Sequence, residues 1–229
     1  MKLAIMQPYF FPYIGYWQLI SAVDTFVIYD DVNYIKQGWI NRNNIIGSNF
    51  NQLISLQVIG ASSFKLINEI EVGNNSQKIL KTIEQTYKKA PYFESVFPLL
   101  QVIMQCEEKN LAKFLNFLIK EVCAYIEIKT TISTSSELVK NNKLKGQDKI
   151  LDLCKVLKAK QYINVIGGRE LYQKEMFSRE NIELSFMKSK LLEYSQFREP
   201  FSANLSIIDV LMFNNKEKVR QYLTGYELV

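Results

Sequence analysis

Two adjacent carboxylates, Asp30 and Asp31, directly follow an apolar run at residues 25–29. A carboxylate pair at the end of a strand can act as a general base or hold a Mg²⁺ ion. The alternative is a turn that ends the strand, where Asp is common. Lys36 follows a few residues later, and its ammonium group could stabilise a developing oxyanion. We therefore take Asp30, Asp31 and Lys36 as the candidate catalytic residues.

The composition restricts the chemistry further, because the chain contains no histidine. A Ser-His-Asp triad, a Cys-His pair and a His-ligated zinc are all excluded. A general acid or base must then be Asp, Glu, Lys, Tyr, Cys or the substrate itself. The three cysteines, Cys106, Cys123 and Cys154, lie far apart without a Cys-x-x-Cys spacing. We expect them to pack in the core and predict neither a metal site nor a disulfide.

Prolines, tyrosines and a glycine crowd the segment "MQPYFFPYIGYWQLI", between a strand-like run and a helix-like run. Prolines fix such a loop, a glycine permits close approach of a ligand, and a helix N-terminus favours an anion such as phosphate. Tyrosine rings offer flat faces for a base or a sugar. A tight turn with aromatic packing is the alternative. The substrate-binding candidates here are Gln7, Pro8, Tyr9, Tyr13, Gly15 and Tyr16.

The segment "NYIKQGWINRNNI" is rich in Asn and has few core residues, which indicates an exposed functional loop. An Arg fork suits phosphate or carboxylate, and a Trp face suits a ring. A polar surface loop is the alternative. The binding candidates in this segment are Asn33, Trp39, Asn41, Arg42 and Asn43.

Two further strand ends carry polar or small residues. "TSSEL" is typical of a helix N-cap, although a capped helix N-terminus can also hold an anion. "VIGGRELY" places a Gly-Gly turn between a strand and a helix. The binding candidates from these two segments are Ser135, Ser136, Gly167, Gly168 and Tyr172.

The elements that must position these residues alternate between strand and helix. Apolar runs at residues 2–6 and 25–29 predict buried strands, and a helical period covers residues 14–22 between them. Such a βαβ unit makes its two strands parallel neighbours. Further strands are predicted at residues 52–58, 65–72, 129–133, 161–166 and 182–186, and a helical middle segment at residues 77–127.

This alternation predicts a single α/β domain over residues 1–229, with a mostly parallel, Rossmann-like sheet flanked by helices. Sites in such sheets lie at the carboxyl ends of the strands, where the candidate residues gather. Net charge is only +5, spread along the chain, which fits an anionic small molecule better than a nucleic acid. No apolar run approaches the roughly 20 residues of a membrane span, and we expect a cytoplasmic protein.

The motifs "AIMQPYFFPYIGYWQLI", "DTFVIYDDVNYIKQGWINRNNI", "TYKKAPYF", "SSEL", "INVIGGRELY" and "ANLSIIDVLMFN" resemble, in this order, the WbqC-like family over nearly the whole chain. The resemblance implies a role in bacterial surface-polysaccharide biosynthesis, especially of O-antigen. It also implies transfer of glycine or a similar acyl group to a nucleotide-linked amino sugar. One departure concerns the Asn-Arg-Asn motif, which a His often precedes in the family; here that position is Ile40.

A second likeness is to nucleotidylyltransferases of the HUP type, in the order of strand, Pro-x-x-x-Gly-aromatic loop, helix and Asp-bearing strand. Those enzymes carry His-x-Gly-His where this chain has Tyr13-Ile14-Gly15-Tyr16, so the likeness concerns the fold more than the chemistry. Three hypotheses stay open: an acyl transferase acting on a nucleotide-linked sugar, a nucleotidyl- or adenylate-forming enzyme with Mg²⁺, and a non-catalytic sugar-nucleotide or partner-binding protein. The sequence does not identify a cofactor.

Overall fold

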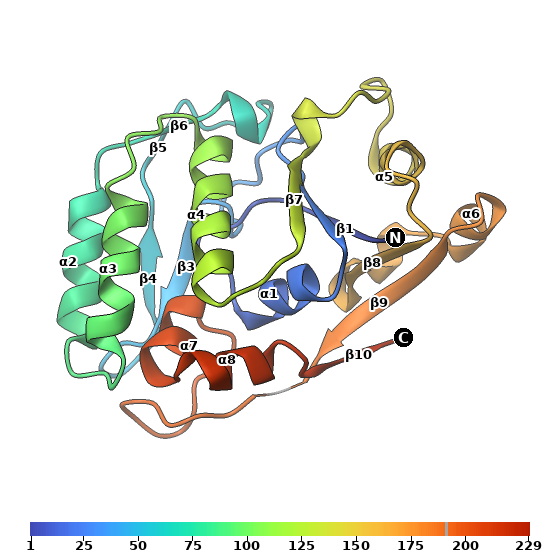
Figure 1. Cartoon of the computed structure of the whole chain (residues 1–229). Helices are drawn as coiled ribbons and strands as arrows, with labels where there is room; N and C mark the ends of the chain where they lie inside the picture. The colour runs from blue at the N-terminus through green and yellow to red at the C-terminus, as the bar shows by residue number, and fades with distance from the viewer. Residues whose placement is uncertain (191) are drawn as a thin grey trace.

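The computed structural model describes residues 1–190 and 192–229, and its centre is a six-stranded sheet with the order β10-β9-β8-β1-β2-β7 (Figure 1). The strands of this sheet are Lys2–Met6 (β1), Thr25–Ile28 (β2), Thr131–Thr134 (β7), Gln161–Val165 (β8), Glu183–Ser189 (β9) and Tyr226–Leu228 (β10). All neighbours pair in parallel except β10, which runs antiparallel to β9. The predicted α/β fold with a mostly parallel, Rossmann-like sheet is confirmed.

The sheet grows outward from β1 in two directions. The chain first adds β2 and β7 on one side of β1, then crosses to the other side and adds β8 and β9. The strand order therefore reverses between β1 and β8. In open α/β sheets, ligands bind at the carboxyl ends of the strands near such a reversal.

Helices cover both faces of the sheet. They are Ile14–Ser21 (α1), Ser76–Tyr87 (α2), Phe93–Met104 (α3), Leu111–Tyr125 (α4), Gly146–Val156 (α5), Lys174–Arg179 (α6), Ile207–Phe213 (α7) and Lys216–Tyr222 (α8). The predicted helical middle segment corresponds to α2, α3 and α4. No helix in the described part of the chain has the length and apolar character to cross a bilayer.

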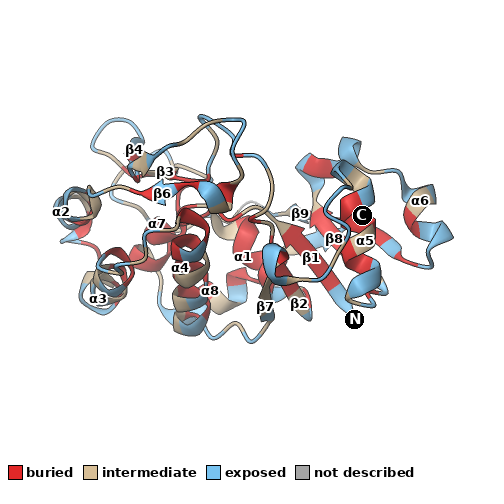
Figure 2. Ribbon diagram, turned by 90° about the horizontal axis from the view of Figure 1, so that it is seen from above, coloured by how far each residue is buried: buried red, intermediate tan, exposed pale blue. Residues whose placement is uncertain are grey.

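Alternation along the strands assigns side chains to two cores. On β1, Leu3 and Ile5 pack with α5 and α6, whereas Ala4 joins the larger core formed with α1, α4 and α7. The buried residues follow the sheet and the inner sides of these helices (Figure 2). Cys123 and Cys154 are buried in these cores, and burial raises the pKa of both thiols to about 12. No disulfide joins the cysteines of the described chain.

Two small antiparallel pairs lie outside the central sheet. Arg42–Ile45 (β3) pairs with Gln52–Ser55 (β4), and Val58–Ile59 (β5) pairs with Glu71–Val72 (β6). The sequence-based prediction of a continuous strand over residues 65–72 was wrong, because a 3₁₀ turn at Ile67–Glu69 interrupts it. The Glu69 carboxylate accepts the N–H of Leu66 at 2.8 Å, and this local contact favours the turn over an extended strand.

The loop after β1 is held in a strained backbone conformation. Phe11 has a φ angle of 44°, in the left-handed region that a bulky residue rarely adopts. Its carbonyl oxygen accepts hydrogen bonds from Asn43 Nδ2 and from Ser206 Oγ, both at 2.8 Å. Because Asn43 Nδ2 also donates to the carbonyl oxygen of Phe10, one amide fixes two consecutive peptides. Such strain persists only where the surroundings determine the backbone.

We expect Asn43→Ala to lower the free energy of unfolding by about 2–3 kcal/mol, since the Phe10 carbonyl oxygen loses its donor and the Phe11 carbonyl oxygen keeps only Ser206 Oγ. Urea denaturation measures the effect. The control is Asn44→Ala on the same strand, whose side chain makes no hydrogen bond within the described structure and should cost about 0.5 kcal/mol. Equal losses in the two variants would contradict a clamping role for Asn43.

Candidate functional site

Four strand ends that the sequence supplies with polar or small residues meet at one edge of the sheet. The parallel pairings of β2 with β7, β1 with β2 and β1 with β8 bring their carboxyl ends to the same side. A backbone hydrogen bond from Tyr29 N to the Met6 carbonyl oxygen, 2.8 Å long, joins the first residue after β2 to the last residue of β1. The prediction that these four ends share an edge is confirmed.

Asp30 is almost fully buried at this edge, with 2% of its surface exposed. Its carboxylate accepts hydrogen bonds from Ser136 N at 2.9 Å, Ser136 Oγ at 2.5 Å and Asn68 Nδ2 at 3.2 Å. These donors belong to the 3₁₀ turn after β7 and to the turn before β6. Asp30 therefore fixes two loops to the end of β2.

Asp31 is held by two lysines that lie far along the chain. Lys140 Nζ and Lys149 Nζ contact its Oδ2 atom at 2.9 and 3.0 Å, and Lys149 also donates to the Asp31 carbonyl oxygen at 2.9 Å. Burial acts to raise the pKa of Asp31, but the contacts with Lys140 and Lys149 outweigh it and lower the pKa below its usual value. Lys149 Nζ also lies 5.1 Å from the centre of the Tyr29 ring.

A cleft opens beside Asp31 and has a volume of about 640 Å³. We call it the lysine cleft; its lining residues are Tyr29, Asp31, Val32, Asn33, Leu66, Ser136, Asn142, Leu144, Lys145, Gly146 and Lys149. The first turn of α5 forms one wall, with the exposed Lys145 at its N-cap. Gly146 has a φ angle of 52°, a conformation that favours glycine. The helix N-terminus and the lysines make this wall electropositive.

A second hollow, of about 280 Å³, lies over the strained loop. We call it the aromatic pocket; its lining residues are Tyr9, Pro12, Tyr13, Trp39, Asn43 and Asn204. The structure thus brings together aromatic candidates from the two separate segments after β1 and β2. A backbone hydrogen bond from Phe10 N to the Trp39 carbonyl oxygen, at 3.1 Å, joins these segments.

The side chains of several candidates from these segments are buried or hydrogen-bonded to the protein's own backbone. Asn41 Nδ2 donates to the Leu56 carbonyl oxygen, Arg42 donates to the carbonyl oxygens of Gly38 and Gln37, and Tyr16 is buried. Pro8 is buried, and the Gln7 carbonyl oxygen accepts the Tyr16 hydroxyl at 2.9 Å. A Cβ atom on Gly15 would lie 2.5 Å from Tyr13 Cε2, so this glycine leaves room for a wall of the aromatic pocket.

The remaining candidates divide between the cleft and its surroundings. Asn33 and Ser136 line the lysine cleft, while Ser135 is fully buried and its carbonyl oxygen accepts Lys140 Nζ. Tyr172 accepts a hydrogen bond from Asn164 Nδ2 at 3.0 Å and packs on Tyr162. Gly167 is exposed, Gly168 lies against Asn164, and Lys36 is exposed outside the lining of both hollows.

Sequence reasoning missed Lys140, Lys145 and Lys149, which supply much of the positive charge near Asp31. The signal was present in "LVKNNKLKGQDK", where a basic run precedes a glycine and a helix. Lysines are usually solvated, however, and only the fold shows that the Lys140 side chain is 1% exposed and that of Lys149 9% exposed.

The carboxylates at this edge are a poor fit to a divalent cation. Both Asp30 oxygens accept hydrogen bonds from N–H or O–H donors, and Asp31 is contacted by two ammonium groups. Within residues 1–190 and 192–229, no three Asp, Glu, Cys or His side chains are grouped to hold a metal ion. The lysines of the cleft, rather than a metal ion, would neutralise the phosphate charge of a nucleotide bound here.

Comparison with known proteins agrees with the motifs. The model of the WbqC-like protein family matches residues 7–221, which include the strained loop, both carboxylates and the lysine cleft. The chain belongs to the WbqC-like protein family. A relative with the printed name "Uncharacterized protein Rv1507c", from Mycobacterium tuberculosis, is 29% identical over 229 residues and covers 97% of each chain. No solved structure matches the chain.

We expect Asp31→Asn to lower the free energy of unfolding by about 3 kcal/mol at pH 7, because two buried lysines lose their counter-charge. The lowered pKa of Asp31 means that its contribution is complete above the unfolded-state pKa of about 3.9 and is lost as the pH falls through the folded-state pKa. The difference between wild type and variant should therefore shrink below about pH 4. Urea denaturation from pH 7 to pH 3 measures it.

The matched control is Asp148→Asn, which removes an exposed carboxylate from the first turn of α5. It should change the stability by only about 0.5 kcal/mol through the helix dipole. A wild-type advantage over Asp31→Asn that stays constant down to pH 3 would show that the carboxylate charge is not what stabilises this edge.

Proposed function

We propose that this protein is a transferase of bacterial surface-polysaccharide (O-antigen) biosynthesis, and that it attaches glycine or a similar acyl group to a nucleotide-linked amino sugar. Membership of the WbqC-like family supports a role in surface-polysaccharide biosynthesis. The observation that supports substrate binding most strongly is the lysine cleft at the carboxyl edge of the sheet. Because nucleotide-linked sugars are cytoplasmic metabolites, we expect the protein to act in the cytoplasm.

The lysine cleft suits the diphosphate of a sugar nucleotide for two reasons. The N–H groups in the first turn of α5 have no acceptors within the helix, and together with Lys145 and Lys149 they favour phosphate oxygens. The volume of about 640 Å³ lies within the usual range of ligand pockets, roughly 300–1,000 Å³. Asn33 and Asn142 add amide groups at the rim, which can bind sugar hydroxyls.

Asp31 is the group that we place next to the amine of the sugar. It lines the cleft, and its lowered pKa keeps it ionised at neutral pH. The amine attacks the carbonyl carbon of the activated acyl group, the bond to the donor's leaving group breaks, and the proton released by nitrogen passes to a carboxylate. When phosphate draws Lys149 toward the ligand, its attraction for Asp31 weakens and the carboxylate becomes a stronger base.

The aromatic pocket offers a surface of a different kind at the same edge. Tyr9, Tyr13 and Trp39 present flat faces, and Asn43 and Asn204 add amides. A sugar or a base can stack on such faces while its polar atoms contact the amides. We assign this pocket to a ring of the substrate.

We expect Lys145→Gln to weaken binding of a UDP- or dTDP-linked amino sugar about tenfold, since one ammonium near the phosphates is lost. Isothermal titration calorimetry measures the dissociation constants. Lys143→Gln is the matched control, because Lys143 is an exposed lysine of the same loop that does not line the cleft. Its affinity should stay within twofold of wild type. Equal affinities for wild type and Lys145→Gln would place the ligand elsewhere.

A transfer assay then separates the possible activities. Wild-type protein is incubated with the sugar nucleotide and an activated glycyl donor, and mass spectrometry follows the addition of one glycyl unit to the sugar. Asp31→Asn should slow this addition at least 100-fold, in line with the loss of a general base. Pyrophosphate release from ATP without transfer would indicate an adenylate-forming enzyme, and binding without turnover would indicate a binding protein.

A further inference from the structure

A third hollow adjoins the lysine cleft across the end of β2. We call it the amide pocket; its lining residues are Asp30, Asn68, Asn110, Ala112, Lys113, Asn116, Thr134, Ser136 and Glu137. Ser136 lines both hollows, while Asp30 lines the amide pocket and Asp31 lines the lysine cleft. Consecutive residues of one strand end thus point into two neighbouring sites. Two neighbouring sites of this kind suit an enzyme that joins two substrates.

The amide pocket contains a hydrogen-bond acceptor without a partner. Asn116 Nδ2 donates to Thr134 Oγ1 at 3.0 Å. The Oδ1 atom of Asn116 is buried and has no hydrogen bond within the described structure. A buried acceptor left unpaired is unfavourable, so a ligand that brings an N–H group here is favoured.

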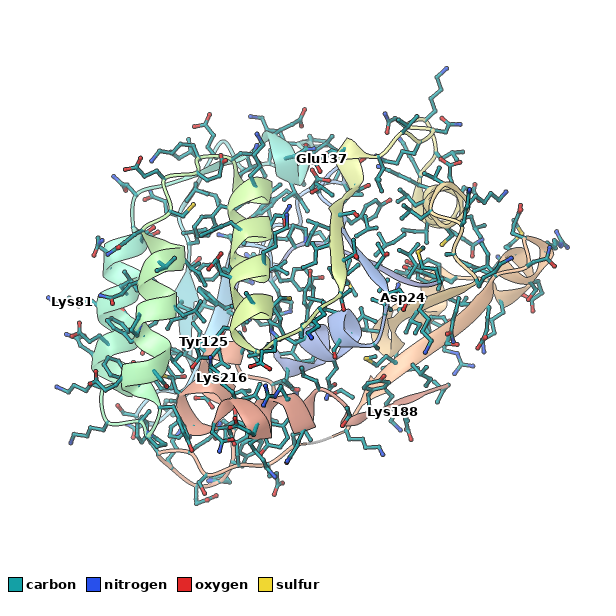
Figure 3. All side chains as sticks on the ribbon, viewed as in Figure 1. Asp24, Lys81, Tyr125, Glu137, Lys188 and Lys216 are labelled. Carbon is teal, nitrogen blue, oxygen red and sulfur yellow. The ribbon has the colours of Figure 1, made fainter. Side chains whose placement is uncertain are left out.

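Charges of both signs line the amide pocket. Asp30 and Glu137 supply carboxylates near the end of β7, and Lys113 supplies an ammonium group in the first turn of α4. Glu137 lies at the same edge of the molecule as the beginning of α4 (Figure 3). The N–H of Ala112, by its position in the first turn, has no acceptor within the helix. The lining therefore suits a ligand that carries both charges.

Hydrogen bonds among the other amides hold the pocket in shape. Asn110 caps α4 by accepting the N–H of Lys113 at 3.1 Å, and its Nδ2 donates to the Asn68 carbonyl oxygen at 2.7 Å. The side chain of Asn68 donates to Asp30 at 3.2 Å. The volume of about 230 Å³ is below the usual range for drug-sized ligands and fits a small molecule.

We propose that the amide pocket binds a small α-amino acid as its zwitterion. The ammonium group donates to Asn116 Oδ1 and faces Asp30, while the carboxylate faces Lys113 and the Ala112 N–H. The inference rests on the proposed function, since it makes this pocket the site that recognises the free amino acid whose acyl group is transferred only after a separate activation of its carboxylate. It also assigns a role to Asn68, Asn110, Lys113 and Asn116, which the sequence does not mark as candidates.

Calorimetric titration of the full-length protein with glycine tests the proposal. Wild type should bind glycine and bind both acetate and methylammonium at least tenfold more weakly, because each carries only one of the two charges. Asn116→Leu removes the free acceptor at similar volume and should weaken glycine binding about tenfold. Asn116→Asp keeps an acceptor at this position and should bind glycine within threefold of wild type.

Lys113→Met should also weaken glycine binding about tenfold, whereas Lys120→Met, at an exposed lysine of the same helix, should leave it unchanged. Each variant is titrated with the sugar nucleotide as well. An unchanged affinity there shows that the variant is folded and separates this proposal from the lysine cleft. Failure of wild type to bind glycine, or binding by Asn116→Leu with wild-type affinity, would overturn the inference even if the sugar nucleotide binds.

Discussion

The attachment of Asp30 and Asp31 to surrounding loops is the interaction on which this edge of the sheet depends. Two adjacent carboxylates directly follow a buried strand. Burying either of them without hydrogen-bonding or charged partners would cost free energy. Asp30 takes its donors from the turns near β6 and β7, and Asp31 takes two lysines from the segment leading into α5 and from α5 itself. Three connections far apart in the sequence are therefore held in register with β2. The lysine cleft lies beside Asp31 and the amide pocket beside Asp30.

The two carboxylates also divide the edge chemically. On the side of Asp31, lysines and the first turn of α5 give a positive wall, which suits phosphate. On the side of Asp30, amides and both signs of charge surround a smaller space. A single pair of adjacent residues can serve both sides because successive side chains on an extended chain point in opposite directions.

The loop after β1 shows why prolines, tyrosines and glycine occur together there. Phe11 adopts a backbone conformation that is costly for a bulky residue, and Asn43 and Ser206 hold its carbonyl oxygen. This conformation places Tyr9 and Tyr13 beside Trp39 around a hollow at the start of α1. Gly15 is required because a Cβ atom would meet the Tyr13 ring. The crowding of residue types is thus a requirement of one loop geometry.

The sequence by itself determined the class of fold and the edge that carries polar residues, because strand periodicity and the rule for parallel sheets are local or general. It also identified Asp30, Asp31 and the aromatic segments as neighbours at that edge. Only the tertiary structure decided which side chains face a hollow. Asn41 and Arg42 look like binding residues in the sequence and prove to hold their own loop, whereas Lys145 and Lys149 look like solvated surface lysines and line the cleft. The physical reason is that burial and the pairing of charges depend on segments more than 100 residues apart, as for Lys149 and Asp31, and no local pattern records such a contact.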